Sequence, residues 1–106
     1  MKHMTPKEVK ALLDQAGPSP FLLDVREPWE FETCHIEGST LIPMGQIPQR
    51  FEELDSEQET VVICHHGRRS LQIAEYLEHA GFTNLINLTG GIDAWSHDVD
   101  PSMPTY

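Results

Sequence analysis

The sequence predicts an α/β fold, in which a parallel sheet is covered by helices on both faces. Two observations predict it. Short apolar runs of strand length alternate along the chain with segments whose apolar residues recur at helical spacing. The runs at 21–25 and 60–63 are almost wholly apolar, as in strands buried on both sides. With 106 residues and 39% hydrophobic content, a single domain spanning 1–106 is expected.

The first half of the chain begins with a helix. Thr5-Pro6-Lys7-Glu8 is typical of a capping box with Pro at the first helical position, which predicts a helix from about Pro6 to Ala16. Gly and Pro at 17–20 end it, and Phe21–Val25 is the first core strand. Three weaker elements follow, a helical turn, a strand and a short surface helix, at 28–31, 40–42 and 47–54.

The second half contains the strongest strand, Thr60–Ile63, which is rich in β-branched residues and places Cys64 at its C-terminal end. A helix is expected from Ser70 to Ala80, with Gly81 as its left-handed cap. The remaining elements are a last strand, a terminal helix and a Pro-containing tail, at 84–88, from 90 onward, and at 97–106. Sites of parallel sheets lie beyond the carboxyl ends of the strands, which is where Cys64 lies.

Composition excludes several functions. A net charge of −10 and a pI near 4.8 disfavour non-specific nucleic-acid binding, which requires clustered Lys and Arg. No apolar stretch approaches the roughly 20 residues of a membrane-spanning helix, and the first residues lack the pattern of a signal peptide. Two cysteines in a chain with a sufficient core do not suggest disulfides, so a cytoplasmic location is expected.

The segment Cys64-His65-His66-Gly67-Arg68-Arg69-Ser70 has the features of a reactive thiol. A thiol attacks as the thiolate, and a helix N-terminus with nearby cations can lower a cysteine pKa from about 8.5 to roughly 3.5–7.5. Gly67 lets successive N–H groups point inward as an anion nest, and Arg68 and Arg69 add positive charge. A cysteine that only packs in the core needs none of these neighbours. We therefore predict a thiolate that meets a small anion.

The same histidines raise the question of a metal. Cys and His are the usual zinc ligands, and Cys34-His35 lies upstream. Adjacent residues rarely direct side chains to one ion, and no Cys-x-x-Cys or His-x-x-x-His pair is present, so no metal is expected. His65 and His66 are interpreted as residues that line or tune the pocket, and whether either exchanges protons stays open.

Three further segments, together with the loop that begins at Cys64, carry a resemblance to a known family. In their order and spacing they resemble the rhodanese homology domain, the thiosulfate sulfurtransferase family, over nearly the whole chain. The segments are Leu22–Glu27 with Glu30-Phe31, then His35-Ile36-Glu37-Gly38-Ser39, and Gly90-Gly91-Ile92-Asp93-Ala94-Trp95.

The resemblance implies a rhodanese-like three-layer sandwich with a central parallel sheet of about five strands. It also implies a ping-pong sulfur transfer without a cofactor. Cys64 would take the outer sulfur of thiosulfate or a similar donor as a persulfide, and cyanide or a thiol would remove it. The backbone N–H groups of His65 to Ser70 would cradle the persulfide. Arg69, and less securely Arg68, would orient the anionic donor.

Other residues receive structural or open interpretations. Asp24, Arg26 and Glu27 follow a core strand and are expected to form charge pairs and hydrogen-bond anchors that steady neighbouring loops. Trp29 and Trp95 are expected to be packing residues. One position departs from the family: Cys34 stands directly before His35, where the family most often carries Gly. It is a spectator or, as a minority hypothesis, a resolving thiol that attacks the Cys64 persulfide.

Three alternatives to small-molecule sulfur transfer remain. A cysteine phosphatase or arsenate reductase of the Cys-x5-Arg kind carries Arg six positions after Cys, whereas Arg69 is five positions after Cys64 and Ser70 is sixth. The shorter loop favours one sulfur atom over a tetrahedral phosphate. A non-enzymatic binding module is disfavoured because Cys64 is present. A relay that hands persulfide sulfur to a thiol-bearing partner protein is not separable from small-molecule turnover, and the oligomeric state is open.

Overall fold

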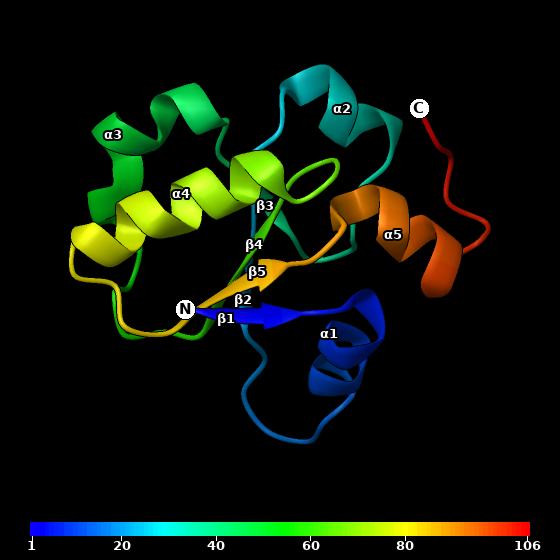
Figure 1. The fold of residues 1–106 in the computed structure, drawn as a ribbon, viewed down its shortest axis with the longest axis horizontal. Coiled ribbons are helices and arrows are strands. Elements are labelled where there is room, and N and C mark those ends of the chain that lie inside the picture. Colours follow the sequence, from blue (N-terminus) through cyan, green and yellow to red (C-terminus); the bar gives the residue numbers. More distant parts are fainter.

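The sheet has five strands, all parallel, in a computed structural model that describes residues 1–106. In spatial order the strands are β1-β5-β4-β2-β3 (Figure 1). Their bounds are β1 Lys2–Met4, β2 Phe21–Asp24, β3 Thr40–Leu41, β4 Thr60–Ile63 and β5 Leu85–Leu88. In register, Asp24 of β2 lies beside Ile63 of β4, and Val62 of β4 lies beside Asn87 of β5. The strands β2, β4 and β5 therefore end at the same edge of the sheet. Residues that follow these strands are thereby brought together.

Helices cover both faces of this sheet, and short 3-10 turns, η1 and η2, flank one of them. The bounds are α1 Pro6–Leu13, α2 Pro28–Thr33, η1 Met44–Gln46, α3 Ile47–Arg50, η2 Phe51–Glu53, α4 Arg68–His79 and α5 Gly91–Asp98. Figure 1 shows α3 and α4 on one side of the sheet and α1 and α5 on the other. None of the helices combines the length and the apolar content that crossing a lipid bilayer requires.

The alternation of side chains along each strand divides the core into two apolar clusters. Leu23 and Val62 point to the face covered by α3 and α4, whereas Leu22 and Val61 point to the face covered by α1 and α5. The central strand β4 is buried at all four positions. This arrangement of two helical layers around a parallel sheet confirms the α/β three-layer fold.

Element boundaries differ from the expected ones in two instructive places. The first helix ends at Leu13, three residues earlier than predicted, because Asp14 caps it and Gly17 adopts φ +103° before two prolines. The first strand, β1, was not predicted. Its three residues are mostly exposed and carry no apolar run, and they are held by backbone pairing to β5 at the sheet edge.

Candidate active site

Cys64 lies between β4 and α4, at the edge where the strands end. Its side chain is 1% exposed and borders a cavity of about 240 Å³. The other lining residues are His65, His66, Arg68 and Arg69. The structure thus brings five of the seven loop residues singled out in the sequence around one small cavity.

The sulfur atom of Cys64 has two polar neighbours. The N–H of Gly67 donates to Sγ at 3.0 Å, and the thiol donates to Ser70 Oγ at 3.3 Å. Ser70 in turn donates to Oδ1 of Asn87, 2.6 Å away on β5. Asn87 was not predicted as part of the site, although a buried polar residue in an otherwise apolar strand was a signal for it.

The backbone around the sulfur forms an anion-binding loop. Gly67 adopts φ +99° directly before the first turn of α4, a conformation that L side chains rarely adopt. Apart from Gly67, no backbone N–H from His65 to Ser70 donates to a protein acceptor. N–H groups at a helix N-terminus carry partial positive charge and favour an anion. A thiolate, or an outer sulfur attached to it, would meet these donors.

The N-terminus of α5 holds the loop in place through backbone hydrogen bonds. The N–H of Ile92 donates to the carbonyl oxygen of Cys64 at 2.8 Å, and that of Asp93 donates to the carbonyl of His65 at 3.0 Å. Gly91 allows this approach, because a Cβ there would lie 2.5 Å from the Cys64 carbonyl oxygen. A side chain at Gly91, the second glycine of the closing signature, would therefore clash with the backbone of the loop.

The two arginines of the loop have different surroundings. Arg69 forms a bidentate ion pair with Glu30, with Nη1 and Nη2 at 2.7 and 2.8 Å from the two carboxylate oxygens. The hydrogen bond from Arg69 lowers the pKa of Glu30 to about 2, although burial of this carboxyl opposes the shift. The same bond raises the pKa of Arg69. Arg68 is exposed and makes no ion pair, so its guanidinium is available at the cavity.

Tyr106 reaches the site from the far end of the chain, which Figure 1 shows returning toward α2. Its hydroxyl accepts from Arg26 Nη1 at 2.9 Å and donates to Glu30 Oε2 at 2.7 Å. Its ring stacks on His65, with centroids 4.0 Å apart. Burial raises the pKa of Tyr106 to about 12, so the hydroxyl remains a donor at neutral pH. Because 97–106 was expected to be a tail, Tyr106 was not predicted to lie at the site.

The residues expected to steady the loops largely do so. Asp24 and Arg26 form a fully buried ion pair at 2.7 Å, and Arg26 also donates to the Cys34 carbonyl at 2.7 Å. Glu27 differs, because it is exposed and its backbone N–H donates to Glu30. Asp24 and Arg26 therefore match the expected role, whereas Glu27 contributes only through its backbone.

The remaining residues interpreted from the sequence are Trp29, Trp95 and Cys34. Trp95 is buried in the core, whereas Trp29 is 59% exposed and packs through its ring, which meets Tyr106 edge-on. Cys34 is a buried free thiol. It packs in the cluster on the α1 and α5 face, whereas Cys64 packs in the opposite cluster. Its resolving role stays a prediction.

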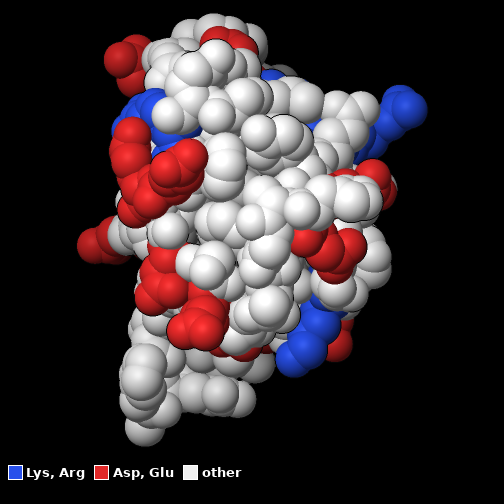
Figure 2. Space-filling view, turned by 90° about the vertical axis from the view of Figure 1, so that its left-hand side faces the viewer, with Lys and Arg blue, Asp and Glu red and all other residues white.

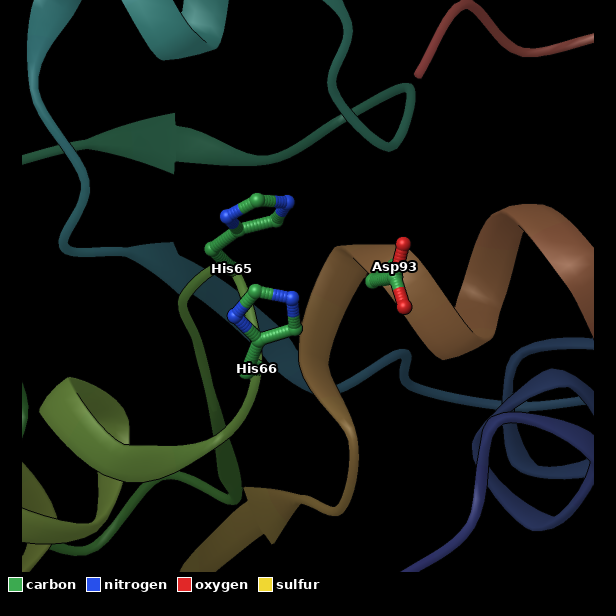
Figure 3. A group of neighbouring side chains, drawn as sticks. All are labelled: His65, His66 and Asp93. Carbon is green, nitrogen blue, oxygen red and sulfur yellow. The ribbon is translucent and has the colours of Figure 1, made fainter. Parts of the chain in front are cut away.

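The two loop histidines lie one on the other, with ring centroids 3.9 Å apart, and the Asp93 carboxylate lies beside them (Figure 3). Burial is the main cause that lowers the pKa of His65, and the neighbouring His66 lowers it further. His65 is therefore favoured as the neutral imidazole near pH 7. Asp93 was part of a sequence signature but was not predicted to lie at the site.

Comparison with known proteins gives a consistent assignment. The family model described as "Rhodanese-like domain" matches residues 5–98. The Arabidopsis thaliana protein "Rhodanese-like/PpiC domain-containing protein 12, chloroplastic" is 44% identical over 89 residues, which cover 80% of this chain and 30% of that protein. The "Thiosulfate sulfurtransferase GlpE" of Pseudomonas syringae pv. syringae is 34% identical, and the match covers 89% of this chain and 86% of that one.

A solved structure agrees with the sequence comparison. The crystal structure of a rhodanese-like domain protein from Staphylococcus aureus superimposes with a TM-score of 0.83 at 34% identity, over 90% of this chain and 91% of that chain. By contrast, the chain spans less than a third of the Arabidopsis relative's length. Similarity to that longer protein therefore concerns one of its parts.

Proposed function

This chain belongs to the rhodanese-like domain family, and we propose that it transfers a sulfane sulfur from a thiosulfate-like donor, through a Cys64 persulfide, to a thiophilic acceptor. One observation carries the proposal. Cys64 lines a cavity of about 240 Å³, and the backbone N–H groups that follow it in the loop, other than that of Gly67, have no protein acceptor. Free donors beside the thiol support a role in stabilising a sulfur anion.

In the first half-reaction the Cys64 thiolate attacks the outer sulfur of thiosulfate. A bond forms between Sγ and that sulfur, the bond to the sulfonate sulfur breaks, and sulfite leaves with the electron pair. The Gly67 N–H, already 3.0 Å from Sγ, stabilises the attacking thiolate. The unoccupied N–H groups of the loop stabilise charge on the transferred sulfur.

In the second half-reaction an acceptor, cyanide or a thiolate, attacks the outer sulfur of the persulfide. The acceptor gains the sulfur, and the electron pair of the broken bond returns to Cys64 as thiolate. The cycle is redox-balanced without a cofactor. It requires a free thiol, and both cysteines of the chain are unpaired, in keeping with a reducing compartment such as the cytoplasm.

The arginine roles in this proposal follow their contacts. Arg68 meets the anionic donor, because it is exposed at the cavity and makes no ion pair. Arg69 is held by Glu30 and so supplies a fixed positive charge beside the cavity. The proposal therefore gives Arg68 the larger part in binding the donor, whereas the resemblance implied Arg69.

A protein acceptor is the second candidate, and one observation favours it. Trp29 is 59% exposed and touches Tyr106, which stacks on a residue that lines the cavity. Exposed tryptophans are common anchors in protein interfaces. Figure 2 shows that carboxylates outnumber basic side chains on one face of the molecule. A thiol-bearing partner with a basic surface would fit this charge, whereas nucleic acid would not.

Intact mass spectrometry after incubation with thiosulfate tests the proposal. Wild-type protein should gain the mass of one sulfur atom, and Cys64→Ala should gain none. Cys34→Ser serves as the matched control, because it removes the other thiol and should keep the adduct. Absence of the adduct in wild-type protein, with its fold confirmed by circular dichroism, would refute sulfur transfer through Cys64.

A further inference from the structure

We propose that His65, His66 and Asp93 form a binding site for a divalent transition-metal ion of the zinc type, at the rim of the Cys64 cavity. No metal was expected from the sequence, because adjacent residues rarely direct side chains to one ion and no Cys-x-x-Cys or His-x-x-x-His pair is present. The fold supplies the third ligand. Asp93, in the first turn of α5, is brought to the loop by the hydrogen bond from its own N–H to the His65 carbonyl.

The three side chains converge. One ligand atom from each lies within 4.8 Å of the other two. In Figure 3 each imidazole has one nitrogen on the side nearer to the Asp93 carboxylate. Metal–nitrogen bonds of about 2.0–2.1 Å in tetrahedral geometry place ligand atoms about 3.3 Å apart. Small rotations of the side chains would bring the ligand atoms from within 4.8 Å of one another to this separation. His66 is exposed and has room for such a rotation.

The ligand atoms of the cluster are also available. Neither the His65 ring, nor the His66 ring, nor the Asp93 carboxylate makes a hydrogen bond or ion pair within the protein; Ser96 and His97 contact only the backbone oxygen of Asp93. Three other histidines behave differently: each holds Nδ1 against a backbone carbonyl oxygen. They are His35, His79 and His97. The lone pairs of the two imidazoles and of the Asp93 carboxylate are therefore available to bind an ion.

The donor set identifies the class of ion. Two imidazoles and one carboxylate suit zinc and neighbouring transition metals, and three protein ligands leave at least one coordination position open. His65 and His66 also line the Cys64 cavity, so a bound ion would lie where donor and acceptor enter.

Calorimetric titration of Zn²⁺ into the Cys64→Ser protein tests the site. This background removes the thiol as a ligand and cannot form a persulfide, so the result does not depend on the proposed sulfur transfer. We expect one ion per chain, with the same affinity as in wild-type protein to within threefold. Binding that disappears in Cys64→Ser, or no binding by either protein, would overturn the proposal.

Two matched pairs of variants in that background assign the ligands. Asp93→Asn should weaken binding at least about tenfold, while Asp98→Asn, which removes the same charge from the same helix, should not. His66→Gln should behave like Asp93→Asn, with His79→Gln as its control. Equal affinity of either test variant and its control refutes this ligand set.

Discussion

Replacing Glu30 by Gln removes the charge that holds Arg69 while keeping the shape of the side chain. In the wild-type protein this carboxylate is almost fully buried and accepts two hydrogen bonds from Arg69, one from Tyr106 and one from the Glu27 N–H. Its pKa is lowered from 4.5 to about 2. The structure therefore stabilises the ionised form strongly relative to the unfolded chain.

The magnitude follows from that pKa. A tenfold change in proton affinity corresponds to about 1.4 kcal/mol, so the lowered pKa corresponds to an upper value of about 3 kcal/mol. Arg69 is 34% exposed, and solvent screening reduces the value to about 2 kcal/mol. We expect Glu30→Gln to lower the free energy of unfolding by about that amount at pH 7. Glu32→Gln, at an exposed position of the same helix α2, is the control.

Urea unfolding at pH 7, 5 and 3 provides the assay. Because the folded-state pKa of Glu30 is lowered, its stabilisation is fully present above the unfolded-state pKa and is lost as the pH falls toward about 2. Gln at position 30 does not titrate. The difference in unfolding free energy between wild type and Glu30→Gln should therefore fall by about half between pH 5 and pH 3. A difference that is the same at pH 3 and pH 7 would refute the assignment of this stability to the Glu30 charge.

Three further outcomes are expected. Gly91→Ala should lower the unfolding free energy by about 2 kcal/mol or more and lower Tm, because its Cβ meets backbone atoms of Cys64 and His65; an unchanged Tm would contradict this account. Tyr106→Phe should cost about 1–2 kcal/mol in urea unfolding, because the hydroxyl bridges Arg26 and Glu30, and full wild-type stability would argue against the bridge. Arg68→Ala should raise KM for thiosulfate about tenfold and leave kcat within threefold; a selective loss of kcat would instead place Arg68 in the transition state.

Local patterns in the sequence were sufficient to predict the layers of the fold and the position of the thiol. The β-branched run before Cys64 and the glycine and arginines after it are adjacent in the chain, so their spacing alone defines a strand, a loop and a helix start. The edge strand β1 was missed because its stability comes from pairing with β5, which is distant in sequence.

Long-range contacts account for what the sequence did not reveal about the site. The partner of Arg69, Glu30, lies 39 positions earlier in the chain, and the residue bonded to both Arg26 and Glu30 is Tyr106, in an irregular segment. Asp93 meets the loop histidines only through the packing of α5. No periodicity or short motif encodes such contacts, because they depend on how the helices pack against the sheet and against one another.

The hydrogen bonds from α5 to the carbonyl groups of Cys64 and His65 have an evolutionary consequence. They orient the loop through the main chain, which every residue type provides. Side chains at the loop positions can therefore be exchanged without loss of the inward-facing donors, so long as the glycines are kept. Selection can therefore change the side chains around the Cys64 sulfur and leave the backbone geometry of the loop intact.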